Sequence, residues 1–151
     1  MKNKEGSIAV NIPEKLLEIK DYTEEGYKPV VDYGEWRVAI LNFLEELLPE
    51  NIDFMSKHDE TDEVFVLLNG KCILFIAEGN KRKITNLYAE DMVPYKIYNV
   101  KRGVWHNHTL SDDAMILIVE NQDTTESNSP IIKLTKEQKE LIKELTVENW
   151  G

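Results

Sequence analysis

The sequence predicts a mainly β protein: a barrel or sandwich of short antiparallel strands, followed by one C-terminal helix. Three observations lead there. The first two are about eight short apolar or alternating segments and the turn signals that separate them at close intervals. The third is a change to helical periodicity at the end of the chain. The 151 residues favour one domain. Within it we expect an N-terminal strand and helix arm (1–35), the β-barrel (36–121) and a C-terminal loop and helix (122–151).

The N-terminal segments combine a short alternating stretch, a turn-rich stretch and a longer strand. Ile8, Val10 and Ile12 alternate with polar or small residues, and Pro13 is well placed to open a short helical turn. Residues 21–35 contain turn-forming glycine and proline. From Trp36 the period becomes two, which predicts a strand. Residues 44–50 are compatible with either a helical turn or a loop.

The middle of the chain alternates apolar runs with turns. Ile52 to His58 is expected to be a strand with Ser56 and His58 on one face. Asn69-Gly70 between two apolar runs is a strong hairpin signal. The remaining strands are expected at 63–68, 72–77, 83–88, 92–100, 104–110 and 114–120.

The last segment predicts a helix. Thr135 followed by Gln138 forms a capping box. Leu141, Ile142 and Leu145 then give one apolar stripe, and we expect the helix to end near Val147.

Charge and composition exclude several classes of partner. The formal net charge is -10, with a pI of about 4.8, which argues against binding to nucleic acid and to anionic membrane surfaces. Cys72 is the only cysteine, so an intramolecular disulfide is excluded, and its apolar run predicts a small buried side chain. With neither a signal peptide nor a membrane span in the pattern, we expect a cytoplasmic location.

The three histidines lie beside predicted strands rather than in a tail. His58 is followed by an acidic turn, and His106 and His108 share one face of a strand. Imidazoles with a carboxylate suit a divalent ion such as zinc, iron, manganese or nickel.

These residues resemble the two sequence motifs of the cupin superfamily. Ser56 to Glu63, then six residues and Gly70, is similar to the first motif, in which His-x-His precedes Glu and Gly. Gly103-Val104-Trp105-His106 is similar to the core of the second motif, Gly-x-x-His. The resemblance covers about residues 52–120 and implies an antiparallel β-barrel or jelly roll with a metal or ligand in its mouth.

The resemblance implies a metal set of His58, Glu63 and His106. Ser56 stands in place of the first motif histidine, Glu50 in place of an opening glycine, and Lys101 in place of a proline. The asparagine expected three residues after His106 is absent. His108 or Glu60 is the candidate to compensate for the missing ligand, or to carry a proton in catalysis.

The leading hypothesis is a metal-dependent enzyme acting on a small polar or carboxylated metabolite, with isomerase, lyase and oxygenase chemistry all open. The alternative is a non-catalytic, metal-free module that binds a small ligand. A third hypothesis is an interaction protein that adds the exposed edge at Ile8 to Ile12 to a partner. The resemblance favours a homodimer, and Lys101 and Arg102 near the mouth would favour an anionic substrate.

Overall fold

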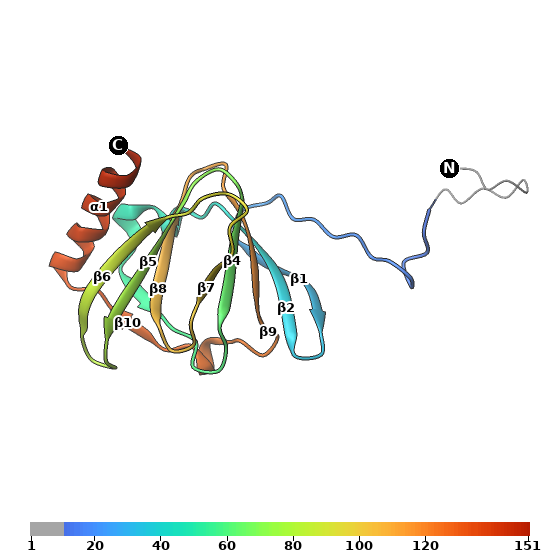
Figure 1. Ribbon diagram of the computed structural model, residues 1–151, viewed down its shortest axis with the longest axis horizontal. Helices are drawn as coiled ribbons and strands as arrows, with labels where there is room; N and C mark the ends of the chain where they lie inside the picture. The colour runs from blue at the N-terminus through green and yellow to red at the C-terminus, as the bar shows by residue number, and fades with distance from the viewer. Residues whose placement is uncertain (1–10) are drawn as a thin grey trace, which may run out of the picture.

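Two antiparallel five-stranded sheets face each other in the computed structural model, which describes residues 11–151 (Figure 1). The first sheet has the order β1-β2-β9-β4-β7, with bounds Tyr27–Tyr33, Trp36–Asn42, Met115–Asn121, Glu63–Asn69 and Tyr98–Val100. The second has the order β10-β3-β8-β5-β6, with bounds Ile131–Lys133, Phe54–Ser56, Trp105–Leu110, Cys72–Gly79 and Ile84–Asp91. Three short 3-10 helices lie between strands, at Glu45–Leu47, Pro49–Asn51 and Glu126–Asn128. The mainly β class expected from the sequence is confirmed.

The barrel interior lies between the two sheets and follows from strict alternation along the strands. In β4 the residues Glu63, Phe65 and Leu67 are buried, whereas their neighbours are only partly buried. In β9 the same is true of Ile116, Ile118 and Glu120. Residues two apart in a strand share a face, so one face of each strand supplies the interior.

The second sheet is covered on both faces, unlike the first. Leu74 faces the barrel interior, whereas Ile73 and Phe75 belong to a second cluster on the outer face. The helix α1 (Lys136–Trp150) covers that outer face, where Ile142 is fully buried (Figure 1). This double burial explains why residues 72–77 form an uninterrupted apolar run rather than an alternating one.

The C-terminal helix begins as expected and ends three residues later. Thr135 accepts a hydrogen bond from the backbone N–H of Gln138, and the Gln138 side chain accepts one from the Thr135 N–H, so the capping box is confirmed. The helix continues beyond Val147 to Trp150, whose Nε1 donates to Asp91 at 3.0 Å. That tertiary contact explains the additional residues.

One end of the barrel is closed by two turns that pack on each other. Gly70, in the turn between β4 and β5, has φ +70°, and a side chain there would lie within 2.7 Å of the turn at 111–114. The Asn69 amide donates to the Asp113 carbonyl, and the Lys71 N–H donates to Ser111 Oγ. The turn expected at Asn69-Gly70 is present, but the hairpin is wrong, because β4 and β5 pair with other strands in different sheets. The close approach of the two turns requires glycine at position 70.

The N-terminal region differs most from expectation. Ile8 and Val10 lie outside the described residues, whereas Pro13 begins a single turn. Residues 11–20 extend away from the barrel (Figure 1), and the carbonyls of Tyr22 and Glu24 accept hydrogen bonds from Asn42 of β2. The barrel's first strand starts at Tyr27, inside the segment expected as an arm. Among residues 11–151 no helix combines the length and apolar character needed to cross a bilayer.

Candidate metal centre

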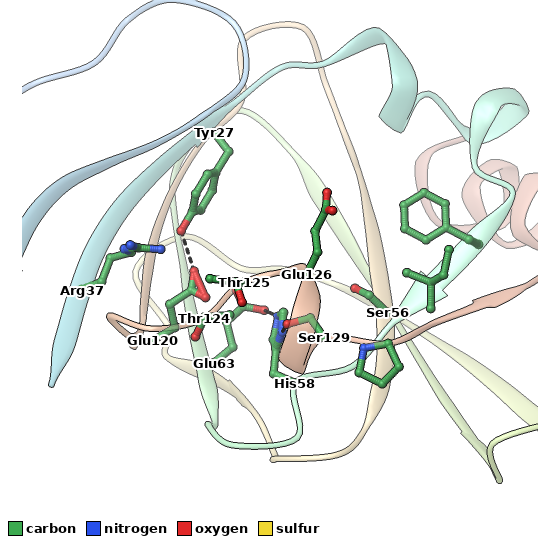
Figure 2. Close-up of a pocket in the computed structure, with 13 residues that line it drawn as sticks. Tyr27, Arg37, Ser56, His58, Glu63, Glu120, Thr124, Thr125, Glu126 and Ser129 are labelled. Atoms are coloured by element: carbon green, nitrogen blue, oxygen red, sulfur yellow. Dashed lines mark hydrogen bonds and ion pairs between the residues drawn. The ribbon is translucent and has the colours of Figure 1, made fainter.

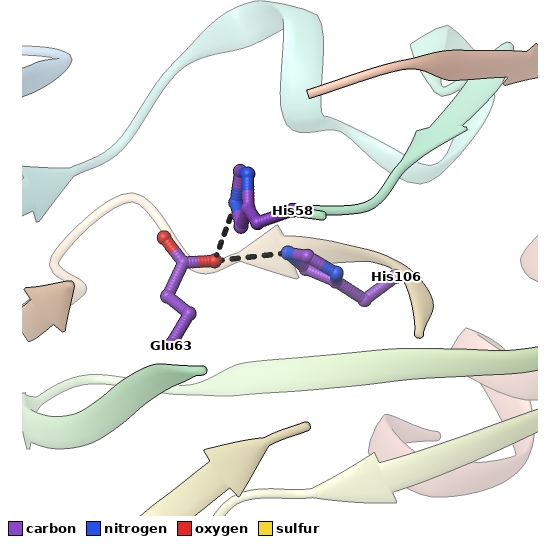
Figure 3. A group of neighbouring side chains, drawn as sticks. All are labelled: His58, Glu63 and His106. Carbon is purple, nitrogen blue, oxygen red and sulfur yellow. Dashed lines mark hydrogen bonds and ion pairs between the residues drawn. The ribbon is translucent and has the colours of Figure 1, made fainter. Parts of the chain in front are cut away.

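Two histidines and one glutamate converge at the open end of the barrel, opposite the closing turns (Figure 3). Glu63 Oε1 lies 3.0 Å from His58 Nε2 and 2.9 Å from His106 Nε2. The three ligand atoms all lie within 4.8 Å of one another. These are the three residues that the motif resemblance selects, 48 positions apart in sequence at the extremes (His58 to His106).

The two sheets bring the three residues together from opposite walls. Glu63 is the first inward residue of β4 in the first sheet, and His106 is an inward residue of β8 in the second. His58 follows β3, which pairs with β8 through Ser56 and His106. The site therefore depends on the facing of the sheets and on no single local motif.

His106 is held in one orientation by the backbone. Its Nδ1 lies 3.0 Å from the Val104 carbonyl, which can only accept, so Nδ1 carries the hydrogen. A neutral ring then has a lone pair on Nε2, directed at Glu63. Two acceptors 2.9 Å apart require a proton or a cation between them, which is the chemistry of a metal-ligating histidine with its second nitrogen fixed.

Glu63 remains ionised although it is buried. Burial alone would raise its pKa. When Nε2 of His106 and of His58 carries a proton, the hydrogen bonds that the two rings donate outweigh burial and lower the pKa of Glu63 to about 2. For His58, burial lowers the pKa, and the hydrogen bond and charge of Glu63 reverse this and raise it. A carboxylate that stays charged and rings that present nitrogen atoms form a donor set that fits a divalent transition-metal ion.

The segment between β9 and β10 contributes the second contact of His58. Ser129 Oγ lies 2.7 Å from His58 Nδ1. Ser129 follows the 3-10 helix at Glu126–Asn128, which Thr125 caps. The sequence indicated only a polar loop here, because nothing in its composition shows that Ser129 reaches across to His58.

A pocket of about 710 Å³ opens beside the three residues (Figure 2). Its walls carry hydroxyl groups, three carboxylates and one guanidinium, together with a few apolar side chains. The lining residues are Tyr27, Arg37, Phe54, Ser56, His58, Glu63, Glu120, Thr124, Thr125, Glu126, Ser129, Pro130 and Ile131. A volume of this size accommodates a small metabolite.

Glu120, Tyr27 and Arg37 form a polar group in the pocket wall that sequence reasoning missed. The Tyr27 hydroxyl donates to Glu120 Oε1 at 2.6 Å (Figure 2). Arg37 Nε donates to Asp32 at 3.0 Å. Burial and the neighbouring charge of Glu63 raise the pKa of Glu120. A signal was present: Glu120 continues the inward alternation of Ile116 and Ile118, so period two places it inside the barrel.

His108 lies one step deeper on the same face of β8 as His106. Its ring contacts Phe65 at a centroid distance of 5.6 Å, and its Nδ1 has no hydrogen-bond partner among the described residues. Burial lowers its pKa to about 4, and the neighbouring His106 adds to the shift. His108 does not line the pocket or belong to the three-residue cluster, so its catalytic role stays a prediction.

The other sequence candidates lie outside the pocket. Glu60 Oε2 accepts a hydrogen bond from the Asn128 amide at the surface, and its role as a proton carrier also stays a prediction. Lys101 and Arg102 line a different shallow hollow beside Asp62, which accepts from the Arg102 N–H.

Comparison with known proteins gives similarity in structure only. No protein-family profile matches the chain, and no curated protein matches it. Among solved structures, the capsular polysaccharide assembling protein CapF of Staphylococcus aureus superposes with a TM-score of 0.52 at 14% identity. That alignment covers 82% of this chain and 34% of CapF, so this chain corresponds to about a third of that protein.

Two further structures are similar at lower scores. A cupin-2 domain protein from Shewanella frigidimarina is 13% identical, with a TM-score of 0.47 over 67% of this chain and 85% of that one. Pac13 from Streptomyces, described as a nucleoside dehydratase, is 6% identical, with a TM-score of 0.49 over 78% of this chain and 87% of that one.

The two facing sheets and the cluster drawn from both motifs define a cupin-like barrel. The antiparallel β-barrel that the motif resemblance implies is thus confirmed, and at 14% identity the likeness to CapF concerns the fold alone.

Proposed function

We propose that this chain binds a divalent transition-metal ion through His58, Glu63 and His106 and acts on a small polar molecule held in the adjacent pocket. The observation that carries the proposal is the pair of contacts made by His106. Because Nδ1 donates to the Val104 carbonyl, the neutral ring directs a lone pair at an ionised carboxylate. A cation between the two groups satisfies both.

Three protein ligands would leave coordination positions free, as catalytic sites require, and two of the three, His58 and Glu63, line the pocket. When bound, the ion would supply Lewis acidity to a substrate oxygen. Zinc, iron, manganese and nickel all accept two imidazoles and a carboxylate. The chain's own residues fix the geometry: Val104 sets the tautomer of His106, and Ser129 holds the second nitrogen of His58.

The direct test is metal content. The full chain is purified without added metal, incubated with each of the four ions, and the bound metal per chain is measured by elemental mass spectrometry. We expect close to one ion per chain for the wild type, and loss of the ion in His58→Ala and in His106→Ala. Thermal unfolding should show stabilisation of the wild type by the same ion.

His108→Gln is the matched control, because it alters the third histidine outside the cluster. It should retain the ion. A wild type that binds none of the four ions and gains no thermal stability from them would overturn the proposal, as would loss of metal in His108→Gln with retention in His106→Ala.

One observation favours the metal-free alternative, a cupin-like module that binds a small ligand without catalysis. Glu63 Oε1 lies 3.0 Å from Nε2 of His58 and 2.9 Å from Nε2 of His106, so protons on these nitrogens can satisfy the cluster in place of a cation. The metal measurement separates the two, since this alternative expects no ion and unchanged thermal stability.

We also propose that the chain forms a homodimer. Four apolar side chains of the N-terminal segment, at Ile12, Leu16, Leu17 and Ile19, are between 48% and 87% exposed. Such a group is unfavourable in water and is typical of a contact surface. Light scattering coupled to gel filtration measures the mass, and a particle of 17.5 kDa at micromolar concentration would contradict this proposal.

A further inference from the structure

We propose that the pocket selects an uncharged, hydroxyl-bearing small molecule and disfavours a carboxylated one, with Glu120 and Arg37 as its recognition pair. This substrate class belongs to the function proposed above, and the location of the site rests on that proposed function. The ligand hydroxyl would donate a hydrogen bond to Glu120 and accept one from Arg37.

Glu120 and Arg37 are neighbours by strand register. Arg37 on β2 lies directly opposite Glu120 on β9. Side chains opposite each other across antiparallel strands have Cβ atoms roughly 4.5–5.5 Å apart. Both residues line the pocket, and the guanidinium lies beside the Tyr27–Glu120 pair in Figure 2.

Arg37 and Glu120 both keep hydrogen-bonding groups that can contact a ligand. Arg37 pairs with Asp32, its only carboxylate partner within 4.0 Å among residues 11–151. Glu120 accepts from Tyr27 through Oε1, and for the part of the chain described its other oxygen has no hydrogen-bond partner. An acceptor and a donor side by side match a hydroxyl group, which can both donate and accept.

The charge of the lining opposes an anionic ligand. Glu63, Glu120 and Glu126 contribute three carboxylates against the single guanidinium of Arg37. A divalent cation would bring this set to neutrality and leave no excess of positive charge for a second anion. Glu63 and Glu120 each lie one residue beyond the Val64–Val119 pair, so the two carboxylates are themselves neighbours.

The rest of the wall suits hydroxyl groups. Ser56, Thr124, Thr125 and Ser129 all line the pocket. Ser56 stands where the motif has a histidine, and a serine side chain leaves space that an imidazole would fill. The rim at Phe54, Pro130 and Ile131 adds apolar surface against which a carbon skeleton can pack.

Matched ligands test this inference directly. Ribitol and ribonate differ in a CH2OH group against a carboxylate, and glycolamide and glycolate differ in an amide against a carboxylate. Each is titrated into the full 15N-labelled chain, loaded with Zn2+ or metal-free, and the dissociation constant and the shifted amides are read by NMR.

We expect ribitol to bind at least about tenfold more tightly than ribonate, because ribitol keeps a charge-assisted hydrogen bond to Glu120 and the ribonate carboxylate is repelled by it. Glu120→Gln should weaken ribitol at least about fivefold and narrow the gap to ribonate. Arg37→Gln should weaken ribitol by a similar factor. Glu144→Gln, on the exposed face of α1, removes the same charge and should leave both affinities unchanged.

Several results would overturn the inference: ribonate or glycolate binding as tightly as its uncharged counterpart, Glu120→Gln leaving ribitol binding unchanged, or neither uncharged probe shifting amides around Glu120. Spectra of the variants report whether they fold. Because the titration is also done without metal, failure of the selectivity is distinguishable from failure of the metal proposal, which the metal content alone decides.

Discussion

The two ends of the barrel interior are built from the same strands and have opposite chemistry. At the closed end the inward residues of β4 and β9 are apolar, as at Leu67 and Ile116, which are 1% and 0% exposed. At the open end the same alternation leads to Glu63 and Glu120, which are still only 6% exposed. The alternation along each strand therefore determines which side chains face the interior. The residue type at the last inward position determines whether that end of the barrel is an apolar core or a polar site.

The layer beneath the site should dominate stability. Phe65 is 1% exposed and its ring centroid lies 6.0 Å from that of His106, so it packs beneath the candidate metal centre from the apolar side. Phe65→Ala should lower the free energy of unfolding by about 3–5 kcal/mol, measured by urea denaturation. Phe54→Ala at the pocket rim, where the ring is 36% exposed, should cost less than about 1 kcal/mol. Equal losses would show that the two ends do not differ in packing.

His108 marks the boundary between the two layers and should make metal-free stability depend on pH. Its folded pKa is about 4, below the roughly 6.5 of an unfolded histidine, so the unfolded chain binds more protons between these values. The contribution of neutral His108 to the free energy of unfolding is therefore complete above pH 6.5. It is lost as the pH falls toward 4, and the total loss is about 3 kcal/mol.

His108→Leu tests this dependence. Urea denaturation of both chains at pH 7 and pH 4.5 gives the difference in unfolding free energy, in which the contributions of Glu63 and His58 cancel. We expect the wild type to lose more stability than the variant over this range. The same loss in both would mean that His108 is hydrated in the folded chain.

A fourth metal-ligating side chain at the open end should increase the affinity for a metal ion. Ser56 lies opposite His106 in the pairing of β3 with β8 and lines the pocket. Ser56→His should raise metal affinity about tenfold or more, equivalent to about 1.4 kcal/mol, as measured by competition with a chelator. Ser56→Ala serves as the control and should bind metal like the wild type, because a neutral serine is a poor ligand. An unchanged affinity in Ser56→His would show that position 56 does not reach the ion.

The smallest effect is expected outside both layers. Lys101 and Arg102 lie by a separate hollow, so the double variant Lys101→Ala/Arg102→Ala should change the free energy of unfolding by less than about 0.5 kcal/mol and leave metal content unchanged. A marked loss of ligand binding in this variant would restore the anionic substrate that the sequence suggested for these two residues.

Much of the fold could be predicted because the signals are local. The turn at Asn69-Gly70 and the capping box at Thr135 depend on residues close in sequence, and both are present in the structure. The helix end was less predictable, because the contact of Trp150 with Asp91 joins residues that are distant in sequence. β1 was missed for a different reason. Its pairing with the next strand, β2, is local, but the register shifts between Pro29 and Val31, and the composition of this stretch is typical of turns.

The residues of the candidate site likewise divide into those with a local sequence signal and those without one. His58, Glu63 and His106 were found because motif spacing marks them. Tyr27, Arg37 and Ser129 were not, because each reaches the site from a strand or loop far away in sequence. Glu120 lies between these cases. Its inward position follows from the alternation along β9, but only the fold shows that this position is in the pocket wall.

The hydrogen bond between Ser129 and His58 links the width of the pocket to the chemistry of the candidate metal centre. Residues 122–130 form one wall and are anchored on both sides, by β9 and by β10. A molecule that pushes this wall outward stretches the 2.7 Å contact and frees the second nitrogen of His58. A bulky molecule that enters the pocket would therefore change the protonation of the His58 ring. The Ser129–His58 contact would then control both the size of molecule that fits and the affinity for an ion.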